Sequence, residues 1–402
     1  MNDTKNNTLL MPAVCGLICL TALAVDLSLP AIPLITKHFS VPQGYGQYVI
    51  SIFVLGYAIG QLFWGAFSDM LGRRKVLIVG LALFVIIGTL SALAQNFEQL
   101  IALRFLHGVS AGVGPVIGRA IVRDISDGNE TVRLMALVTS ILGLAPLFAP
   151  LMGSGIIAIS TWDYTFHAVS AFAVILFLSV LFFVPETNRP ERGLSGFSWG
   201  FVGKLYKTAC DIVGNKHNII SCMLVAVPFG GYYAILTGSP AVLNDVFGYN
   251  ETLFGPLFAI VAVFWFLGAT FSRKYTGRLG IGKLKRMASF LLLLAGVSVF
   301  ASAYFTLPFY VFWASCALYI AGVGIMIPVA TAAALAPFPE AAGAAAALLG
   351  LIQMGLGALT AVVVGLMYDG DTGSMAMAML ALSIVVMVLY MMDGFVSETQ
   401  DS

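Results

Sequence analysis

The most specific local pattern in this chain is Gly65-Ala66-Phe67-Ser68-Asp69-Met70-Leu71-Gly72-Arg73-Arg74-Lys75, which joins two long apolar segments. Gly65 permits a neighbouring helix to approach closely, and Gly72 permits a tight turn. Asp69 can receive the positive N-terminal end of another helix. Basic residues such as the three that end this run collect on the cytoplasmic side of membranes. The run therefore predicts a short cytoplasmic loop between two membrane-spanning helices.

The composition around this run is that of an integral membrane protein. The chain has 402 residues, of which 59% are hydrophobic and 10% are charged, whereas about a quarter of the residues in a soluble domain are charged. A net charge of +1 offers no basic surface for nucleic acid. The five cysteines form no Cys-x-x-Cys pair, which argues against a zinc site. The sequence has no nucleophile with a base, no metal-ligand spacing and no phosphate loop, so we expect no enzymatic activity, no metal and no cofactor.

Twelve apolar runs are long enough to cross a bilayer, since each crossing needs about 20 residues. Six lie in the first half, at Leu9–Ile35, Tyr45–Ser68, Val76–Ala94, Leu100–Val122, Leu134–Ser160 and Tyr164–Val184. Six more follow at Ile219–Leu243, Leu253–Phe271, Met287–Leu307, Phe309–Pro337, Ala341–Met367 and Met375–Met392. The first run has no small-residue cleavage pattern after a short core, so it is interpreted as a retained helix and not a signal peptide. The fold class is an all-α integral membrane protein.

The basic residues predict the orientation of these helices. With the N-terminus in the cytoplasm, almost every Lys and Arg lies on the cytoplasmic side, including Arg119 and Lys285, and only Lys37 is external. Arg104 is the remaining cation and lies inside a span. Because the number of spans is even, both termini are predicted to be cytoplasmic.

The chain is predicted to consist of two related halves. Residues 1–184 form an N-terminal six-helix bundle, 185–217 a polar cytoplasmic connector and 218–402 a C-terminal six-helix bundle. Ala111-Gly112-Val113-Gly114 in the fourth span recurs as Ala321-Gly322-Val323-Gly324 in the tenth. Matches at corresponding positions are what two parallel six-helix repeats require.

Asp26 is the only carboxylate predicted to lie well inside a span. A mid-membrane Asp or Arg costs about 2.5 to 3.5 kcal/mol, so such a residue usually pairs, faces a cavity or marks an ion path. Burial disfavours the charged carboxylate, which makes Asp26 a candidate to take up and release a proton. The alternative is a structural acid that bonds Ser28 or a neighbouring helix. In the C-terminal half we expect no carboxylate well inside a span.

Arg104 lies a turn or two into the fourth span from the same external side. It could pair with Asp26 if both helices face one cavity, or it could extend to the external headgroups. His107, one turn further on, could join a proton relay because imidazole titrates near neutral pH. A helical histidine that is only hydrogen-bonded is the simpler alternative.

The loop pattern at 65–75 closely resembles the loop signature of the major facilitator superfamily. That resemblance implies a fold of twelve transmembrane helices in two pseudo-symmetric six-helix bundles. It also implies a cytoplasmic latch in which Asp69 and Arg73 join an acid at the end of the fourth helix, Asp124 by position. The helix N-terminus that would face Asp69 begins near Ala341 to Gly343.

Other stretches resemble the Bcr/CflA branch of the twelve-helix drug:proton antiporters. These are Asp26-Leu27-Ser28-Leu29-Pro30, Arg104 with Gly108, Gly238-Ser239-Pro240, and Ala342-Gly343-Ala344-Ala345-Ala346 before Gln353. Pro146, Pro150 and Gly153 resemble the antiporter motif of the fifth helix, although Ala145 and Ser154 stand where that motif often has glycine. The prolines remove backbone donors one turn apart, which suits a helix that bends between rocking halves, or one whose kink is merely tolerated.

Candidates for the substrate cavity are aromatic and amide side chains inside the spans. Such groups can hold an amphipathic molecule, although they also pack between helices and line membrane interfaces. The candidates are Tyr57, Gln61, Tyr232, Tyr233, Trp265 and Gln353.

The resemblance implies a proton-coupled exporter that works by alternating access, with Asp26 as proton carrier and Arg104 resetting it. Proton-coupled uptake of a nutrient or siderophore-like solute is the alternative, because one fold can serve either direction. A receptor or a flippase is disfavoured by the intramembrane charges. We expect a monomer in a bacterial inner membrane, with a small-molecule substrate, protons and the lipid bilayer as partners and no nucleic acid.

Overall fold

The computed structural model describes residues 3–126, 128–188, 203, 207, 209–212, 214–338 and 342–400, and these described residues contain helices and no strands. They fall into two units. The first holds the described residues of Met1–Val41 and Ile52–Trp199, and the second those of Pro42–Ser51 and Gly200–Ser402. The α3 helix begins in the second unit and continues in the first.

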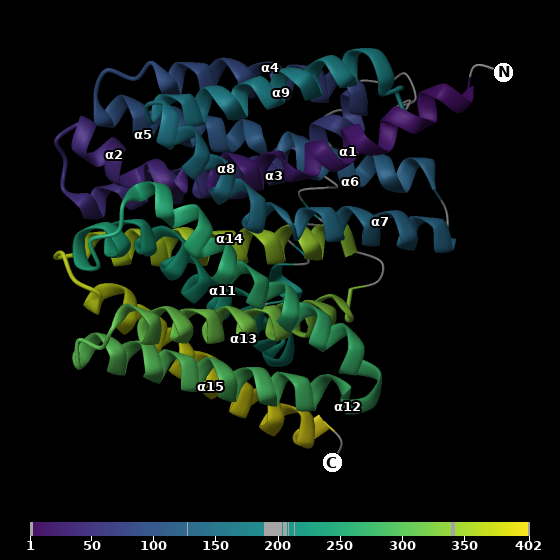
Figure 1. Cartoon of the computed structure of the whole chain (residues 1–402). Coiled ribbons are helices and arrows are strands. Elements are labelled where there is room, and N and C mark those ends of the chain that lie inside the picture. The colour runs from purple at the N-terminus through teal and green to yellow at the C-terminus, as the bar shows by residue number, and fades with distance from the viewer. Residues whose placement is uncertain are drawn as a thin grey trace. The chain divides into compact units, whose positions relative to one another are not determined.

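The first unit is built around α1. Its elements are α1 (Asp3–Asp26), η1 (Leu29–Ala31), α2 (Ile32–His38), α3 (Gly46–Leu71), α4 (Arg73–Ala92), α5 (Phe97–Ala111), α6 (Val113–Ile125), α7 (Gly128–Leu142), α8 (Ala145–Ile159) and α9 (Asp163–Phe183). The α1 helix packs against α6, α7, α8 and α9, while α4 packs against α5 and α9 (Figure 1).

Prolines divide three of the predicted spans of this unit. Pro30, Pro115 and Pro146 each lack the N–H that would bond four residues back, so α1, α5 and α7 end and a new helix follows. At the second break the freed carbonyl of Ala111 accepts a hydrogen bond of 3.1 Å from Thr21 Oγ1 of α1. The predicted first, fourth and fifth spans are therefore each divided into shorter helical segments and are not continuous helices.

The second unit is built around α11 (Lys216–Ala241), which is apolar and buried on almost every side. A helix that is hydrophobic all round belongs inside a bundle, and α11 packs against α13, α14 and α15. The other elements are η2 (Gln43–Tyr45), η3 (Val242–Val246), η4 (Glu251–Leu253), α12 (Phe254–Tyr304), α13 (Phe309–Leu335), α14 (Ala342–Leu366) and α15 (Gly373–Gln400).

The α12 helix makes two crossings. Its 51 residues would extend about 76 Å if straight, far beyond the roughly 30 Å hydrocarbon core. Gly280 interrupts it with a left-handed φ of 77°, a conformation that glycine adopts without a steric penalty. This turn separates the predicted eighth and ninth spans.

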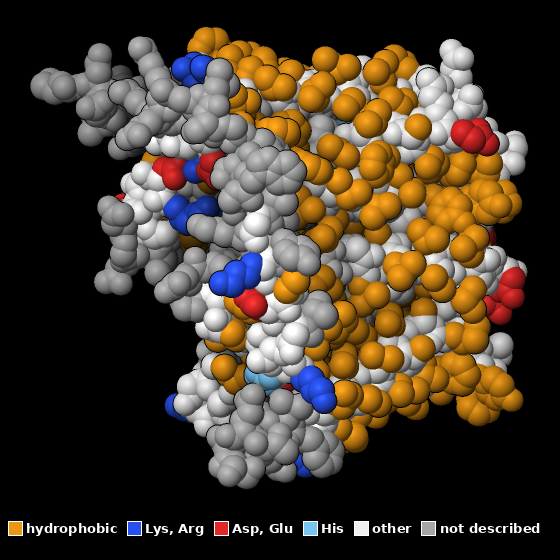
Figure 2. Space-filling view, turned by 180° about the vertical axis from the view of Figure 1, so that it is seen from behind, with side chains coloured by type: hydrophobic (Ala, Val, Ile, Leu, Met, Phe, Trp, Pro, Cys, Tyr) orange, Lys and Arg blue, Asp and Glu red, His pale blue; other side chains and the backbone are white. Residues whose placement is uncertain are grey.

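The described residues account for twelve crossings. Ten helical stretches are long and apolar enough to span a bilayer, one of them the double-length Glu251–Tyr304, and α8 is a shorter apolar helix that completes the fifth span with α7. With the double-length stretch counted as two crossings and the fifth span added, these make twelve. In Figure 2 hydrophobic side chains cover the visible lateral face, and charged ones lie toward its ends. The predicted all-α membrane fold is confirmed.

Candidate proton-coupling site and polar network

Asp26 is the last residue of α1 and is 4% exposed. The helix ends there because Pro30 cannot donate to the Asp26 carbonyl. A carboxylate at the C-terminal end of a helix meets the negative end of the helix dipole, and burial adds to the cost of its charge. Ser28 Oγ bonds the Val25 carbonyl at 2.8 Å and is therefore not committed to Asp26. This position favours a carboxyl group that binds and releases a proton.

Arg104 of α5 is fully buried and extends to the end of α1. Its Nη2 lies 3.5 Å from the Ala24 carbonyl oxygen, and its guanidinium lies 4.2 Å from the centroid of the Phe53 ring. Because the last carbonyls of a helix have no partner within it, a cation there is stabilised by both the carbonyls and the dipole. Arg104 therefore holds the helix end that carries Asp26.

Both expectations for the Arg104 side chain are wrong. The side chain is 0% exposed, so it does not extend to the headgroups. In the part of the chain that the structure describes, no hydrogen bond or ion pair joins it to Asp26. The physical reason is that backbone carbonyls and aromatic rings surround this guanidinium.

His107 supports the Arg104 guanidinium. Its Nδ1 lies 3.3 Å from Arg104 Nη1, and its ring centroid lies 4.1 Å from that of Phe84. Its buried Nε2 has no hydrogen-bond partner among the described residues. The close contact with a cation favours a neutral imidazole that accepts from Arg104. A relay role for His107 remains a prediction.

The α8 helix packs against the chain directly after Asp26. Gly153 is the contact point, because a Cβ there would lie 2.2 Å from the Leu27 carbonyl oxygen and 2.8 Å from Pro30 Cγ. Pro146 is in the first turn of α8, and Pro150 lies inside it. The predicted antiporter motif therefore borders the break that positions Asp26.

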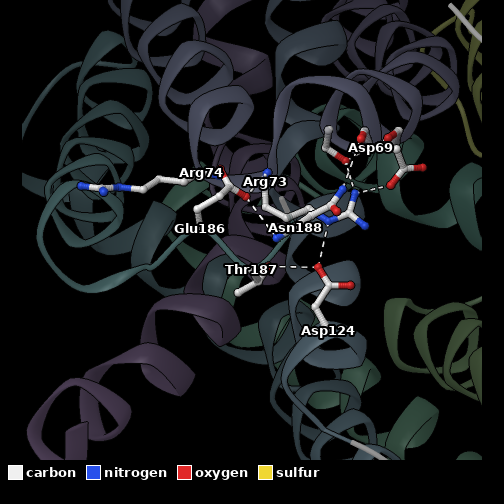
Figure 3. A network of polar contacts seen from close by, with 9 residues as sticks. Asp69, Arg73, Arg74, Asp124, Glu186, Thr187 and Asn188 are labelled. Carbon is white, nitrogen blue, oxygen red and sulfur yellow. Dashed lines mark hydrogen bonds and ion pairs between the residues drawn. The ribbon is translucent and has the colours of Figure 1, made fainter. Parts of the chain in front are cut away.

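A polar network lies at the other end of the first unit and contains the residues of the predicted latch (Figure 3). Arg73 Nε donates to Asp124 Oδ2 at 2.9 Å, Nη1 donates to Ser68 Oγ at 2.7 Å, and the same guanidinium forms an ion pair with Asp69. Gly72 turns the chain between α3 and α4 with a φ of 96°. A Cβ added at Gly65 would lie 3.5 Å from Val116 Cγ1, so Gly65 packs against α6. The structure thus brings Asp69, Arg73 and Asp124 together within one unit.

Sequence reasoning missed three further members of this network. Glu186 accepts from the backbone N–H of Arg73 at 2.7 Å and of Arg74 at 3.1 Å, which satisfies orphan donors at the start of α4. Thr187 donates to Asp124 at 2.9 Å, and Asn188 Nδ2 donates to the Asp69 carbonyl at 3.2 Å. These residues follow the sixth span. The helix start predicted to face Asp69 includes residue 341, which lies outside the described residues.

The predicted substrate residues lie in both units. In the second unit the rings of Tyr232 and Trp265 are 5.0 Å apart and those of Tyr232 and Tyr233 are 5.8 Å apart, so these three form one aromatic cluster. Gln353 is half-buried on α14. Tyr57 and Gln61 lie one turn apart on α3 in the first unit, separate from the cluster in sequence and unit.

Two charged positions extend the sequence analysis. Arg119 lies inside the fourth span, as the predicted run Leu100–Val122 implies, and α6 continues beyond it to Ile125. In the second unit Asp393 of α15 is 7% exposed and its Oδ2 lies 2.8 Å from Lys285 Nζ. Asp393 is the last residue of the apolar stretch Gly373–Asp393, so it lies at the end of the span and not well inside it. The sequence analysis did not name this buried residue, although a lone Asp at the end of the last apolar run marks it.

A model of the Major Facilitator Superfamily matches residues 14–362. The chain belongs to this superfamily. It is therefore a multi-pass membrane transporter of small molecules and not an enzyme.

The proteins similar in sequence to this transporter include some that are named for drug resistance. It is 26% identical to the bicyclomycin resistance protein homolog of Haemophilus influenzae, over 97% of each chain. It is also 26% identical to multidrug resistance protein D of Escherichia coli, again over 97% of each chain. Among solved structures, a D-xylose-proton symporter superposes with a TM-score of 0.77 at 16% identity, covering 96% of this chain and 97% of that one. The last likeness concerns the fold alone.

Proposed function

We propose that this transporter is a proton-coupled exporter of small amphipathic molecules that works by alternating access. The observation that supports it most is the position of Asp26, a buried carboxyl group at a break in the first span, with Arg104 at the same helix end. The names of the bicyclomycin and multidrug resistance relatives support export of drug-like compounds.

In this proposal a proton from outside binds Asp26 and is exchanged for outgoing substrate. Arg104 stabilises the helix end while the carboxyl group changes its protonation state. The Asp69, Arg73 and Asp124 network holds one facing state at the cytoplasmic end. The protein acts as a monomer in a bacterial inner membrane, with both termini in the cytoplasm.

The test uses everted membrane vesicles that are energised to an acidic interior and report their internal pH through a dye. A panel of compounds, with bicyclomycin among them, is added to wild type and to Asp26→Asn. Glu98→Gln serves as control, because Glu98 is an exposed carboxylate of the same unit.

We expect added compounds to release internal protons in wild type and in Glu98→Gln but not in Asp26→Asn. If Asp26→Asn exchanges as well as wild type, the carboxyl group is structural and the mechanism is wrong. If no compound moves protons and right-side-out vesicles accumulate solute instead, the protein is an uptake transporter.

A further inference from the structure

Arg119 of α6 is a cation inside a membrane span for which the mechanism above has no use. It lies six positions before Ile125, the last residue of α6, or about 9 Å along the axis. Its side chain is exposed, although most of α6 is buried. An arginine inside a span normally pairs, faces a water-filled cavity or marks the path of a transported molecule.

Arg119 has polar neighbours, but in the described part of the chain it forms no ion pair. Arg119 Nε donates to the Pro115 carbonyl of the same helix at 3.0 Å, and the guanidinium interacts with the Tyr57 hydroxyl of α3. Within the described ranges no carboxylate forms an ion pair with it. Gln61, one turn from Tyr57, has a buried Nε2 without a hydrogen-bond partner in the described part of the chain.

These three side chains share the edge where α3 meets α6. Seven residues of an α-helix turn through nearly two full turns, so Arg119 lies within about 20° of Gly112 on the helix circumference. A Cβ at Gly112 would lie 3.1 Å from the Gln61 backbone N, which shows that this side of α6 faces α3. The sides that face α1 and α4 are occupied instead by Gly114 and Val113. We call Tyr57, Gln61 and Arg119 the α3–α6 polar patch.

We propose that the α3–α6 polar patch binds the anionic group, a carboxylate or sulfonate, of an amphipathic substrate. A guanidinium presents several N–H donors in a fork that matches such a group. The unpartnered Gln61 amide adds a donor, and the Tyr57 hydroxyl can donate as well. The proposal rests on the transport function above and assigns its substrate class. In the proposed topology the patch lies toward the cytoplasmic end, where an exporter collects its substrate.

The test compares two probes of nearly the same shape, of which only one carries the anionic group that the patch is proposed to bind. Anilinonaphthalene sulfonate carries the anionic group, and phenylnaphthylamine is its uncharged counterpart. Their equilibrium binding to the full-length protein is measured in zwitterionic lipid nanodiscs, with the signal of empty nanodiscs subtracted. No proton gradient is present, so the result does not depend on proton coupling or on Asp26.

We expect Arg119→Gln to weaken binding of the sulfonate by about tenfold or more, as loss of a charge-assisted hydrogen bond predicts. Binding of the uncharged probe should change less than about twofold. Arg119→Lys should retain part of the affinity, and Arg123→Gln, an exposed cation one turn along α6, should retain all of it. Each variant is first checked by size-exclusion chromatography, and only variants that elute as a monodisperse peak are counted as folded.

Three outcomes would overturn the proposal. Equal losses for both probes in folded Arg119→Gln would assign Arg119 a packing role. No loss for the sulfonate, or the same loss in Arg123→Gln, would show that the patch does not recognise the charge. If phosphatidylglycerol in the nanodisc lipid abolishes sulfonate binding, and added sulfonate has no effect on transport, the occupant of the patch is a lipid headgroup.

Discussion

Arg104 Nη2 lies 3.5 Å from the carbonyl oxygen of Ala24, so the cation of the fourth span is held at the end of the helix that carries Asp26. The two residues influence one another through the α1 terminus and not through an ion pair. A change in how Arg104 binds this terminus should alter the field at the carboxyl group two residues on.

Arg104→Lys should therefore impair proton exchange although it keeps the charge. A lysine ammonium cannot lie flat over Phe53 and also contact both His107 and the Ala24 carbonyl, as the planar guanidinium does. We expect the rate of compound-induced proton release to fall about tenfold or more. The rate is measured in everted vesicles at matched protein levels. Arg133→Lys, on an exposed position of α7, is the control and should behave as wild type.

Gly153→Ala should lower both stability and exchange, whereas Gly155→Ala should do neither. The added methyl at Gly153 would lie 2.2 Å from the Leu27 carbonyl, so backbone must shift beside Asp26. Overpacking of this kind costs about 1 to 3 kcal/mol. At Gly155 no atom lies within 4 Å of the added methyl. Thermal unfolding of the purified variants and vesicle exchange measure the difference, and equal behaviour of the two would refute the packing argument.

The sequence was sufficient for the number of crossings because hydropathy acts locally, and twelve apolar runs predict twelve crossings. The helix breaks at Pro30 and Pro115 were not predicted, although each follows from the loss of a donor four residues from its acceptor. The resemblance of the loop at 65–75 to the superfamily signature also implied the pairing of Asp69 with Arg73, and the turn at Gly72 brings the two side chains together.

Contacts that depend on tertiary packing were not predictable. Glu186 bonds a backbone N–H 113 residues away in sequence, and Arg104 bonds a backbone carbonyl, which no residue pattern marks. Arg119 was placed at the cytoplasmic side of the predicted run Leu100–Val122. Its position beside Tyr57 and Gln61 depends on how α6 packs against α3, which the sequence did not predict.

The Arg73 network predicts strongly coupled mutations. Arg73→Gln and Asp124→Asn each remove the ion pair, 2.9 Å between N and O, that joins α4 to α6, so we expect each to slow exchange several-fold and the double variant to be no slower than either one. A double-mutant cycle of initial exchange rates measures this coupling. Lys75→Gln changes an exposed cation of the same loop and should not alter the rate. Independent, multiplying effects of the two variants would contradict a shared role.

The buried pair of Lys285 and Asp393 should dominate the stability of the second unit. It joins α12 to α15 at 2.8 Å with both side chains nearly buried. Removing one partner leaves an uncompensated buried charge, which costs about 3 to 5 kcal/mol. We expect Lys285→Met to lower the unfolding temperature strongly, Lys283→Met, at an exposed neighbour, to have little effect, and Lys285→Met with Asp393→Leu to recover most of the loss.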